Sequence, residues 1–135
     1  PAISLSLHAT ANLPPVQASP DHLQDVWLNL LLNARDAVLS ADGGNIRVDV
    51  TYNEAEQQIE VAVTDDGVGI SADEQSKLFI PFYTTKSQGT GLGLAVCYDI
   101  VKHHAGTIHV HSAAGEGATF TVVLPLSATS AKSSG

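Results

Sequence analysis

The chain has 135 residues, of which 44% are hydrophobic, so it can bury the core of one domain but is too short for two of ordinary size. Its formal net charge is −8, and its lysines and arginines form no basic patch, which argues against nucleic acid as a partner. The single cysteine, Cys97, excludes an internal disulfide and, on a predicted helix, indicates a packing role. The sequence contains no membrane span or signal peptide, and the absence of methionine indicates a fragment cut before Pro1 from a longer protein.

Hydrophobic patterns predict five strands, two long helices and one short helix. In chain order these are a strand at 2–8, a helix from Ser19-Pro20 to about Leu39, strands at 46–52 and 58–64, a short helix at 72–79, a helix from about Gly91 to His104, and strands at 107–112 and 118–124. Residues 80–90 lack periodicity, which predicts a mobile loop.

The connections between these elements predict the fold class. Because two strand connections are too short for crossovers, we expect a two-layer α/β (α+β) sandwich with a mixed five-stranded sheet rather than a doubly wound parallel fold. This domain should occupy residues 1–126, with 127–135 as a small, polar tail or linker.

The first long helix carries a narrow polar stripe beside a broad apolar face. At about 100° per residue, the stripe is formed by Asp25, Asn29, Asn33 and Asp36. A solvated face is the simpler interpretation, but such a face favours lysine, glutamate and glutamine, and asparagine is a poor helix former. An amide oxygen is a hard ligand suited to Mg²⁺, which takes phosphate oxygens and water at its remaining positions. We therefore interpret Asn29 and Asn33, one turn apart, as ligand-binding residues.

Two glycine clusters follow, DDGVGI at 65–70 and GTGLGL at 89–94. Asp65 stands at the end of a predicted strand, where a buried carboxylate can accept a hydrogen bond from an exocyclic amine such as that of adenine. Gly67 and Gly69 permit close backbone approach, although a plain Asp-Gly turn is the alternative. The second cluster opens a helix, where backbone N–H groups favour phosphate, the alternative being a flexible hinge. Its spacing matches neither the dinucleotide-binding G-x-G-x-x-G nor a P-loop.

These segments resemble, in order, the sequence boxes of the sensor histidine kinases. LNLLLNARDA at 28–37 resembles the N box, DDGVGI the first glycine box, KLFIPFYTTK at 77–86 the phenylalanine box, GTGLGL the second glycine box, and AAGEGATF at 113–120 the last one. The TTK ending and the short lid are most similar to the nitrogen-regulation type of two-component kinase. The resemblance implies the catalytic, ATP-binding domain of the gyrase, Hsp90, histidine kinase and MutL superfamily.

The resemblance also implies roles for single residues. Asn33 would hold Mg²⁺, Asn29 would lie near the phosphates, and Asp65 would read the adenine amine. The implied nucleotide-binding set further comprises Gly67, Gly69 and Ile70 of the first glycine box, Gly89, Thr90, Gly91, Leu92, Gly93 and Leu94 around the triphosphate, and Thr119 near the base. Many relatives carry a basic residue where this chain has Asp36, so Arg35 or the lid residue Lys86 would have to supply the phosphate cation. Asn29, Asn33 and Lys86 would be the catalytic residues.

The implied function is to bind ATP and Mg²⁺ and to donate the γ-phosphoryl group to a histidine in two-component signal transduction. In hydrolysing members of the superfamily, the residue four before the metal-binding asparagine is a glutamate that activates water. Asn29 occupies that position here and cannot take a proton at neutral pH. Family acceptor histidines are typically followed by an acidic residue, and none of the six histidines here is.

The acceptor is therefore expected upstream, on a dimerising helical hairpin that the chain lacks. The implied partners are this dimerisation and histidine-phosphotransfer domain and the receiver domain of a response regulator. The parent protein is expected to be a cytoplasmic homodimer or the cytoplasmic part of a membrane sensor. Two alternatives remain open: a non-catalytic nucleotide-sensing or assembly module of the same fold, and a hydrolysing ATPase of the superfamily.

Overall fold

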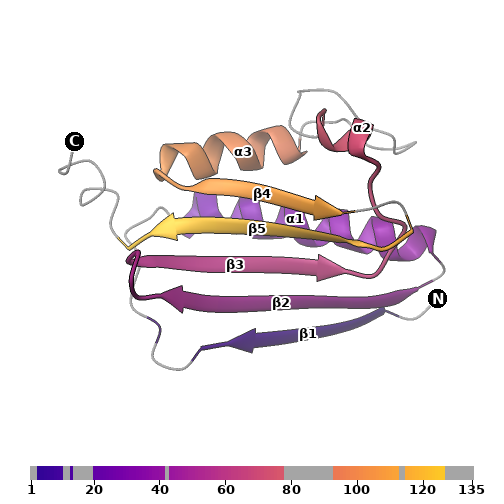
Figure 1. Cartoon of the computed structure of the whole chain (residues 1–135), viewed down its shortest axis with the longest axis horizontal. Coiled ribbons are helices and arrows are strands. Elements are labelled where there is room, and N and C mark those ends of the chain that lie inside the picture. Colours follow the sequence, from indigo (N-terminus) through magenta and orange to yellow (C-terminus); the bar gives the residue numbers. More distant parts are fainter. Residues whose placement is uncertain are drawn as a thin grey trace.

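The computed structural model describes residues 3–10, 13, 20–41, 43–77, 93–112 and 115–126. Five strands form one sheet in the order β1-β2-β3-β5-β4, and the two longer helices lie against one face of it (Figure 1). β1 (Ile3–Ala9) pairs in parallel with β2 (Gly44–Asn53), and the other neighbouring strands pair antiparallel. The predicted two-layer sandwich with a mixed five-stranded sheet is confirmed.

A helical crossover joins the parallel pair β1 and β2. Parallel strands cannot be joined by a tight turn, and α1 (Pro20–Ser40) supplies the required connection across the sheet. The helix begins at Pro20, as predicted from the Ser19-Pro20 pair, and the fixed φ of proline suits the first helical position; Ser19 lies outside the described residues. It ends where the Gly43 N–H donates to the Val38 carbonyl at 2.8 Å, with Gly43 at a φ of 105° that favours glycine.

The remaining strands bring two distant segments together. β3 (Gln58–Asp65) forms a hairpin with β2, and β4 (Thr107–Ser112) forms one with β5 (Ala118–Pro125). β5 inserts between β3 and β4, so the end of β3 lies beside the start of β5, and Asp65 pairs with Ala118. Each predicted strand is present, with ends no more than two residues from the expected ones.

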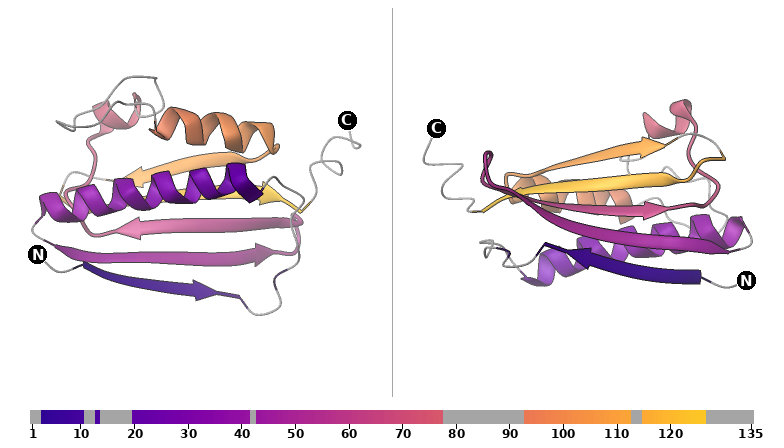
Figure 2. Two further views of the ribbon diagram at one scale, coloured as in Figure 1. Left: turned by 180° about the vertical axis from the view of Figure 1, so that it is seen from behind. Right: turned by 60° about the horizontal axis from the view of Figure 1, so that its bottom comes forward.

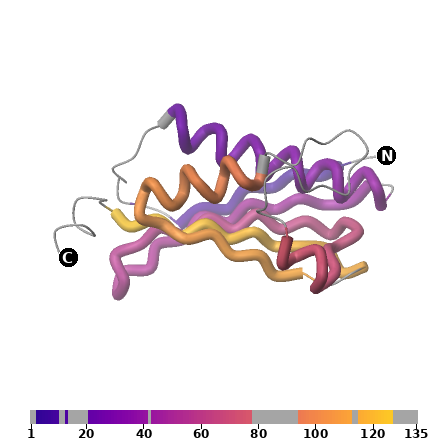
Figure 3. Tube along the Cα trace, turned by 90° about the horizontal axis from the view of Figure 1, so that it is seen from above, coloured from indigo at the N-terminus to yellow at the C-terminus, as the bar shows by residue number. Residues whose placement is uncertain are grey.

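The core lies between the helices and one face of the sheet, as the views from behind and from above show (Figures 2 and 3). α1 and α3 (Gly93–His103) pack on each other, with α1 over β2 and β3 and α3 over β4. The largest fully buried side chains are Phe120, Leu30, Val26, Val38, Val101, Val122 and Cys97. The packing role predicted for Cys97 is confirmed, and burial raises the pKa of its thiol to about 12, so it stays protonated.

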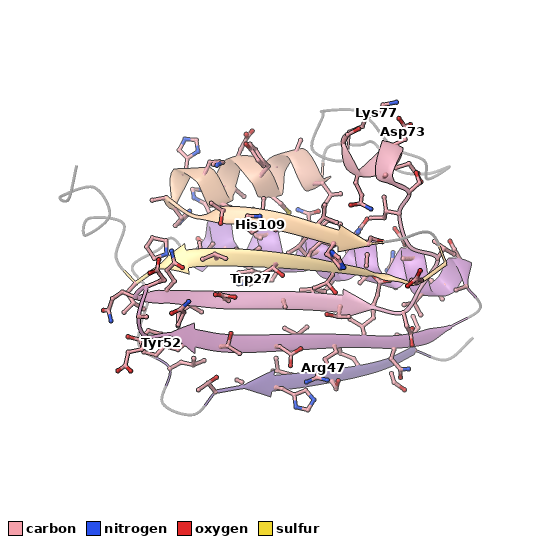
Figure 4. All side chains as sticks on the ribbon, viewed as in Figure 1. Trp27, Arg47, Tyr52, Asp73, Lys77 and His109 are labelled. Carbon is pink, nitrogen blue, oxygen red and sulfur yellow. The ribbon has the colours of Figure 1, made fainter. Side chains whose placement is uncertain are left out.

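The opposite face of the sheet carries no helix in the described part of the chain. It is polar, and Figure 4 shows Arg47 of β2 and His109 of β4 on this side, with Trp27 of α1 behind the sheet. Arg47 donates to Asp49 at 3.0 Å. We refer to this surface as the open face.

The short helix differs from the prediction. α2 (Ala72–Gln75) spans four residues rather than the expected 72–79, and a capping box between Ser71 and Glu74 begins it. The Lys77 N–H donates to Glu74, three residues back instead of four, so the α-helical pattern has ended there. Residues 78–92, which include the loop expected to be mobile, lie outside the described residues.

Candidate functional site

The buried side of β3 ends in a carboxylate. Alternate residues Ile59, Val61 and Val63 point into the core, and Asp65 is the next in this series. Asp65 is only 3% exposed and is the one charged side chain that is buried among the described residues. Its Oδ1 accepts a hydrogen bond from the Gly67 N–H at 2.9 Å. The predicted place of Asp65 at the strand end is confirmed.

The surroundings of Asp65 make its carboxyl harder to ionise than a solvated one. Burial raises the pKa of this carboxyl above its ordinary value of 3.8, hydrogen bonds from the Gly67 and Ala118 main chain act in the opposite direction, and the charge of Asp66 adds to the rise. A ligand N–H group that donated to Asp65 would lower this pKa again, because it would stabilise the charged form. The site therefore suits a ligand that brings a hydrogen-bond donor.

The first glycine cluster lies against the last turns of α1. A Cβ atom at Gly67 would lie 2.5 Å from the main-chain carbon and oxygen of Ala37, so no larger residue fits there without moving the helix or the loop. The Val68 N–H donates to the same Ala37 oxygen at 3.3 Å. The close backbone approach predicted at Gly67 is thus an approach to the main chain of α1. At Gly69 the φ of 76° turns the chain toward Ile70.

Asp66 has a different environment from Asp65, and sequence reasoning missed it. Its exposed carboxylate accepts two hydrogen bonds from Asn45, from the main-chain N–H at 2.7 Å and from Nδ2 at 2.9 Å. These bonds lower the pKa of Asp66 below its ordinary value of 3.8. Asp66 therefore fastens the start of β2 to the loop after β3, and the doubled acid in DDGVGI is the only sequence signal for it.

The turn between β4 and β5 closes the other side of Asp65. A Cβ atom at Gly117 would lie 2.2 Å from the Asp65 carbonyl oxygen, and Gly117 has a φ of 78°. The Gly115 N–H donates to the Val68 carbonyl at 2.7 Å. Two glycine boxes far apart in the sequence are therefore packed backbone to backbone at the end of β3.

Thr119, predicted to lie near the base, has its side chain on the opposite face of the sheet from Asp65. Side chains alternate along a strand, and Ala118, not Thr119, pairs with Asp65 on the buried face. The Thr119 hydroxyl lies 3.2 Å from the Thr64 hydroxyl on the open face. A pocket of about 130 Å³ lies at these strand ends; its lining includes Thr64, Asp65, His111, Glu116 and Thr119.

The polar stripe of α1 has the predicted orientation, at the edge of the buried helix face. Asn29 and Asn33 are half-buried, while Val26, Leu30 and Ala34 beside them are in the core. The Asn29 amide nitrogen donates one hydrogen to the Asp25 carbonyl at 2.9 Å, so a ligand at Asn29 would meet its second N–H or its carbonyl oxygen. Asn33 lies one turn before Ala37, the residue that contacts the first glycine cluster.

The structure describes only part of the expected phosphate-binding set. Gly93 begins α3, and Leu94 is half-buried and packs against the core. The predicted residues Lys86, Gly89, Thr90, Gly91 and Leu92 lie outside the described residues. Of the two candidate cations, Arg35 pairs with Asp36 at 3.3 Å on the exposed side of α1.

Two features bear on metal binding. Within the described ranges, no three His, Cys, Asp or Glu side chains are grouped so that they could hold a metal ion. The Asn33 amide is a hard oxygen ligand and fits Mg²⁺, because this ion retains several waters and takes its other ligands from phosphates. At the end of α3, ring nitrogens of His103 and His104 hydrogen-bond to the carbonyls of Asp99 and Ile100 at 2.9 and 2.8 Å.

The chain is similar to proteins of known families. The family model described as "Histidine kinase-, DNA gyrase B-, and HSP90-like ATPase" matches residues 18–128. The sensor histidine kinase ZraS of Escherichia coli K12 is 46% identical over 127 residues, which cover 94% of this chain and 26% of that protein. Sporulation kinase E of Bacillus subtilis 168 is 37% identical over 124 residues, covering 92% of this chain and 16% of that protein.

Solved structures give the same result. The catalytic domain of histidine kinase ThkA matches with a TM-score of 0.81 and 29% identity, covering 94% of this chain and 81% of that one. Full-length ShkA in complex with AMPPNP matches with a TM-score of 0.76 and 25% identity, covering 91% of this chain and 25% of that one. Among the helices in the described ranges, none combines the length and the apolar character needed to cross a membrane.

Proposed function

The chain belongs to the family of histidine kinase-, DNA gyrase B- and HSP90-like ATPases, and from this premise we propose that it binds ATP with Mg²⁺ and donates the γ-phosphoryl group to a histidine on a separate domain. It is the histidine kinase ATPase domain of a two-component sensor kinase. The chain spans 26% of the length of ZraS, and in this proposal the acceptor histidine and the signal-sensing parts would lie outside it.

The buried carboxylate of Asp65 is the observation that carries the nucleotide assignment. A charged group that is 3% exposed is costly unless a partner stabilises it, and the pKa of Asp65 is raised by that burial. The N6 amine of adenine would donate to this carboxylate, whereas guanine would present its O6 oxygen and be repelled. Asp65 would thereby orient the base and select ATP over GTP.

The α1 stripe supports the phosphate end of the proposal. Asn33 would be the protein ligand of Mg²⁺, and the second N–H of the Asn29 amide would donate to phosphate oxygens. The ion, when bound, would offset negative charge on the phosphates, which matters for a chain with a net charge of −8. The residues that would wrap the triphosphate are 89–94, with Lys86 as the lid cation.

The proposal assigns this chain to phosphoryl transfer rather than to hydrolysis. Asn29 stands where a general base would have to activate water, and a carboxamide takes no proton at neutral pH. Transfer to a histidine would then depend on positioning and on charge neutralisation. The acceptor would be provided by the dimerisation domain of a homodimeric parent, and the receiver domain of a response regulator would take the phosphoryl group next.

Calorimetric titration of the 135-residue chain tests the binding part. We expect ATP with MgCl₂ to bind, ATP with a chelator to bind more weakly, and GTP to bind at least about tenfold more weakly than ATP, because Asp65 would face an acceptor. Equal affinity for ATP and GTP would contradict the role given to Asp65. No binding of either nucleotide would contradict the function itself.

A further inference from the structure

Two side chains that the proposed nucleotide contacts do not include hold the loop that follows Asp65. The Gln75 amide nitrogen, at the end of α2, donates to the Ile70 carbonyl at 2.9 Å and to the Ser112 carbonyl at 2.8 Å. The Ser112 hydroxyl, at the end of β4, accepts from the Ile70 N–H at 2.8 Å and donates to the Gly117 carbonyl. We call these two side chains the Gln75–Ser112 clamp.

The clamp fixes both main-chain polar groups of Ile70. This residue directly follows Gly69, whose φ is 76°, and the glycines at 67 and 69 give the segment little conformational preference of its own. Such a loop keeps one conformation only if bonds from outside restrict it. The bond between Asp66 and Asn45 fixes the first residue of the loop, and Ala37 fixes its middle. The clamp therefore fixes its last residue, Ile70.

Gln75 suits this task because of its amide group. An amide NH₂ has two donors, and the two carbonyl oxygens that it meets come from different parts of the fold. A carboxylate of the same shape would place an acceptor against two acceptors. Gln75 also lies at the point where the chain leaves α2 toward residues 78–92, so one side chain joins that exit to the loop and to β4.

We propose that Gln75 and Ser112 are positioning residues for the nucleotide: they hold Ile70, and through it the loop at 66–70, in the place that lets Asp65 meet an adenine base. This inference rests on the proposed function. A purely structural brace would change the stability of the fold and leave the preference for adenine unchanged, whereas a positioning residue also changes that preference.

The test uses four forms of the chain: wild type, Gln75→Leu, Gln75→Glu, and Gln24→Glu as the matched control on the exposed side of α1. Affinities for ATP and GTP, both with MgCl₂, are measured by calorimetry at about pH 8 and about pH 5.5, which brackets the raised pKa expected of a glutamate facing carbonyl oxygens. Each value is divided by the wild-type value at the same pH. That ratio removes the pH effects that all four forms share. The charged and ionisable groups around the clamp are Asp65, Asp73, Glu74, Lys77, His111 and Glu116.

We expect Gln75→Leu to weaken ATP binding about tenfold at both pH values, because two hydrogen bonds are lost, and to narrow the gap between ATP and GTP. Gln75→Glu should weaken it at least as much at pH 8 and recover at pH 5.5, where the protonated acid regains a donor. Gln24→Glu should behave as wild type. Ser112→Ala should resemble Gln75→Leu and provides a second variant if Gln75→Leu does not fold.

Wild-type binding with unchanged ATP and GTP affinities in the Gln75 and Ser112 variants would overturn the inference and leave the proposed function intact. Equal weakening of ATP and GTP, with no recovery of Gln75→Glu at low pH, would reduce the clamp to a structural brace. Absence of nucleotide binding by the wild type would overturn both proposals. Amide exchange needs no variant: the Ile70 N–H should be protected without nucleotide, and rapid exchange would overturn the clamp.

Discussion

At the residue scale, Asp65 and Asp66 are adjacent in sequence and opposite in environment. Asp65 is 3% exposed with a raised pKa, whereas Asp66 is exposed with a pKa lowered by two bonds from Asn45. Alternation along β3 predicts which of the two faces the core, so the buried acid could be identified from the sequence. The partner of Asp66 could not, because Asn45 is distant in sequence and meets the loop only once β2 and β3 pair.

Asp65→Asn should weaken ATP binding without destabilising the fold. The amide oxygen can still accept from the Gly67 N–H and the buried charge is removed, while the bond from the Ala118 main chain is weakened, so the free energy of unfolding should change little. It presents a weaker acceptor to the adenine amine, so ATP affinity should fall by about tenfold to a hundredfold. Denaturant unfolding and calorimetry measure the two effects, with Asp49→Asn on the open face as control. Unchanged ATP affinity would remove Asp65 from the site.

Asp66→Asn should lower the free energy of unfolding, and the size of this loss should depend on pH. Because the folded pKa of Asp66 lies below 3.8, its ionised form adds stability in full above pH 3.8, and this contribution is lost as the pH falls through the folded pKa. The variant should therefore be less stable than wild type at pH 7, and the difference should shrink below about pH 3.8. Unfolding followed across this range checks it, with exposed Asp99→Asn as control. A pH-independent difference would contradict the ionic origin.

Asn33→Ala should remove the metal linkage of binding. If Asn33 holds Mg²⁺, the gain in ATP affinity on adding MgCl₂ should largely disappear in the variant, and transfer activity should fall by orders of magnitude. Gln24→Ala, an amide removed from the other side of the same helix, should keep both. The comparison of ATP affinities with MgCl₂ and with a chelator is the readout. A full Mg²⁺ response in Asn33→Ala would show that the ion is held elsewhere.

At the element scale, each strand and both long helices could be predicted from local pattern, since apolar alternation and helical spacing are local properties. Thr119 shows the limit of that approach: its motif places it near the site, but the pairing of Asp65 with Ala118 turns it to the open face. The clamp is a second case, because a glutamine at the end of a short helix has no visible target until β4 lies beside it. The orientation of Thr119 and the contacts of the clamp both depend on which strands lie side by side in the sheet, and these strands are far apart in the sequence.

Gly67 gives a prediction for the contact between α1 and the first glycine cluster. In Gly67→Ala the new methyl would meet main-chain atoms of Ala37 at 2.5 Å and of Val38 at 2.8 Å, which cannot rotate away. We expect a loss of about 1–3 kcal/mol in the free energy of unfolding, with weaker ATP binding as the loop moves. Gly115→Ala is the control, because its φ of 81° adds strain while no atom lies within 4 Å of the new methyl. Unchanged stability of Gly67→Ala would mean that α1 does not restrict Gly67.

At the scale of the whole molecule, the mixed sheet follows from connection lengths, but its order does not. The insertion of β5 between β3 and β4 joins the first and last glycine boxes at Asp65, and nothing local in the sequence specifies that neighbour. Local sequence patterns do not predict this neighbour. The order of the motifs does, because the resemblance to sensor histidine kinases implies that the first and last glycine boxes both lie around the base. The nitrogen-regulation subtype and the place of residues 78–92 remain predictions.

The central claim is that this chain holds and presents ATP while another domain carries the acceptor, and incubation with γ-labelled ATP and Mg²⁺ tests it most directly. Alone, the chain should bind ATP, hydrolyse it very slowly and acquire no label, because Asn29 offers no general base and no histidine here has an acceptor-like sequence. With the upstream helical hairpin restored or added in trans, an acid-labile phosphohistidine should form on that hairpin, since proximity supplies much of the catalysis. Label on His8, His22, His103, His104, His109 or His111, or rapid turnover by the isolated chain, would contradict the account.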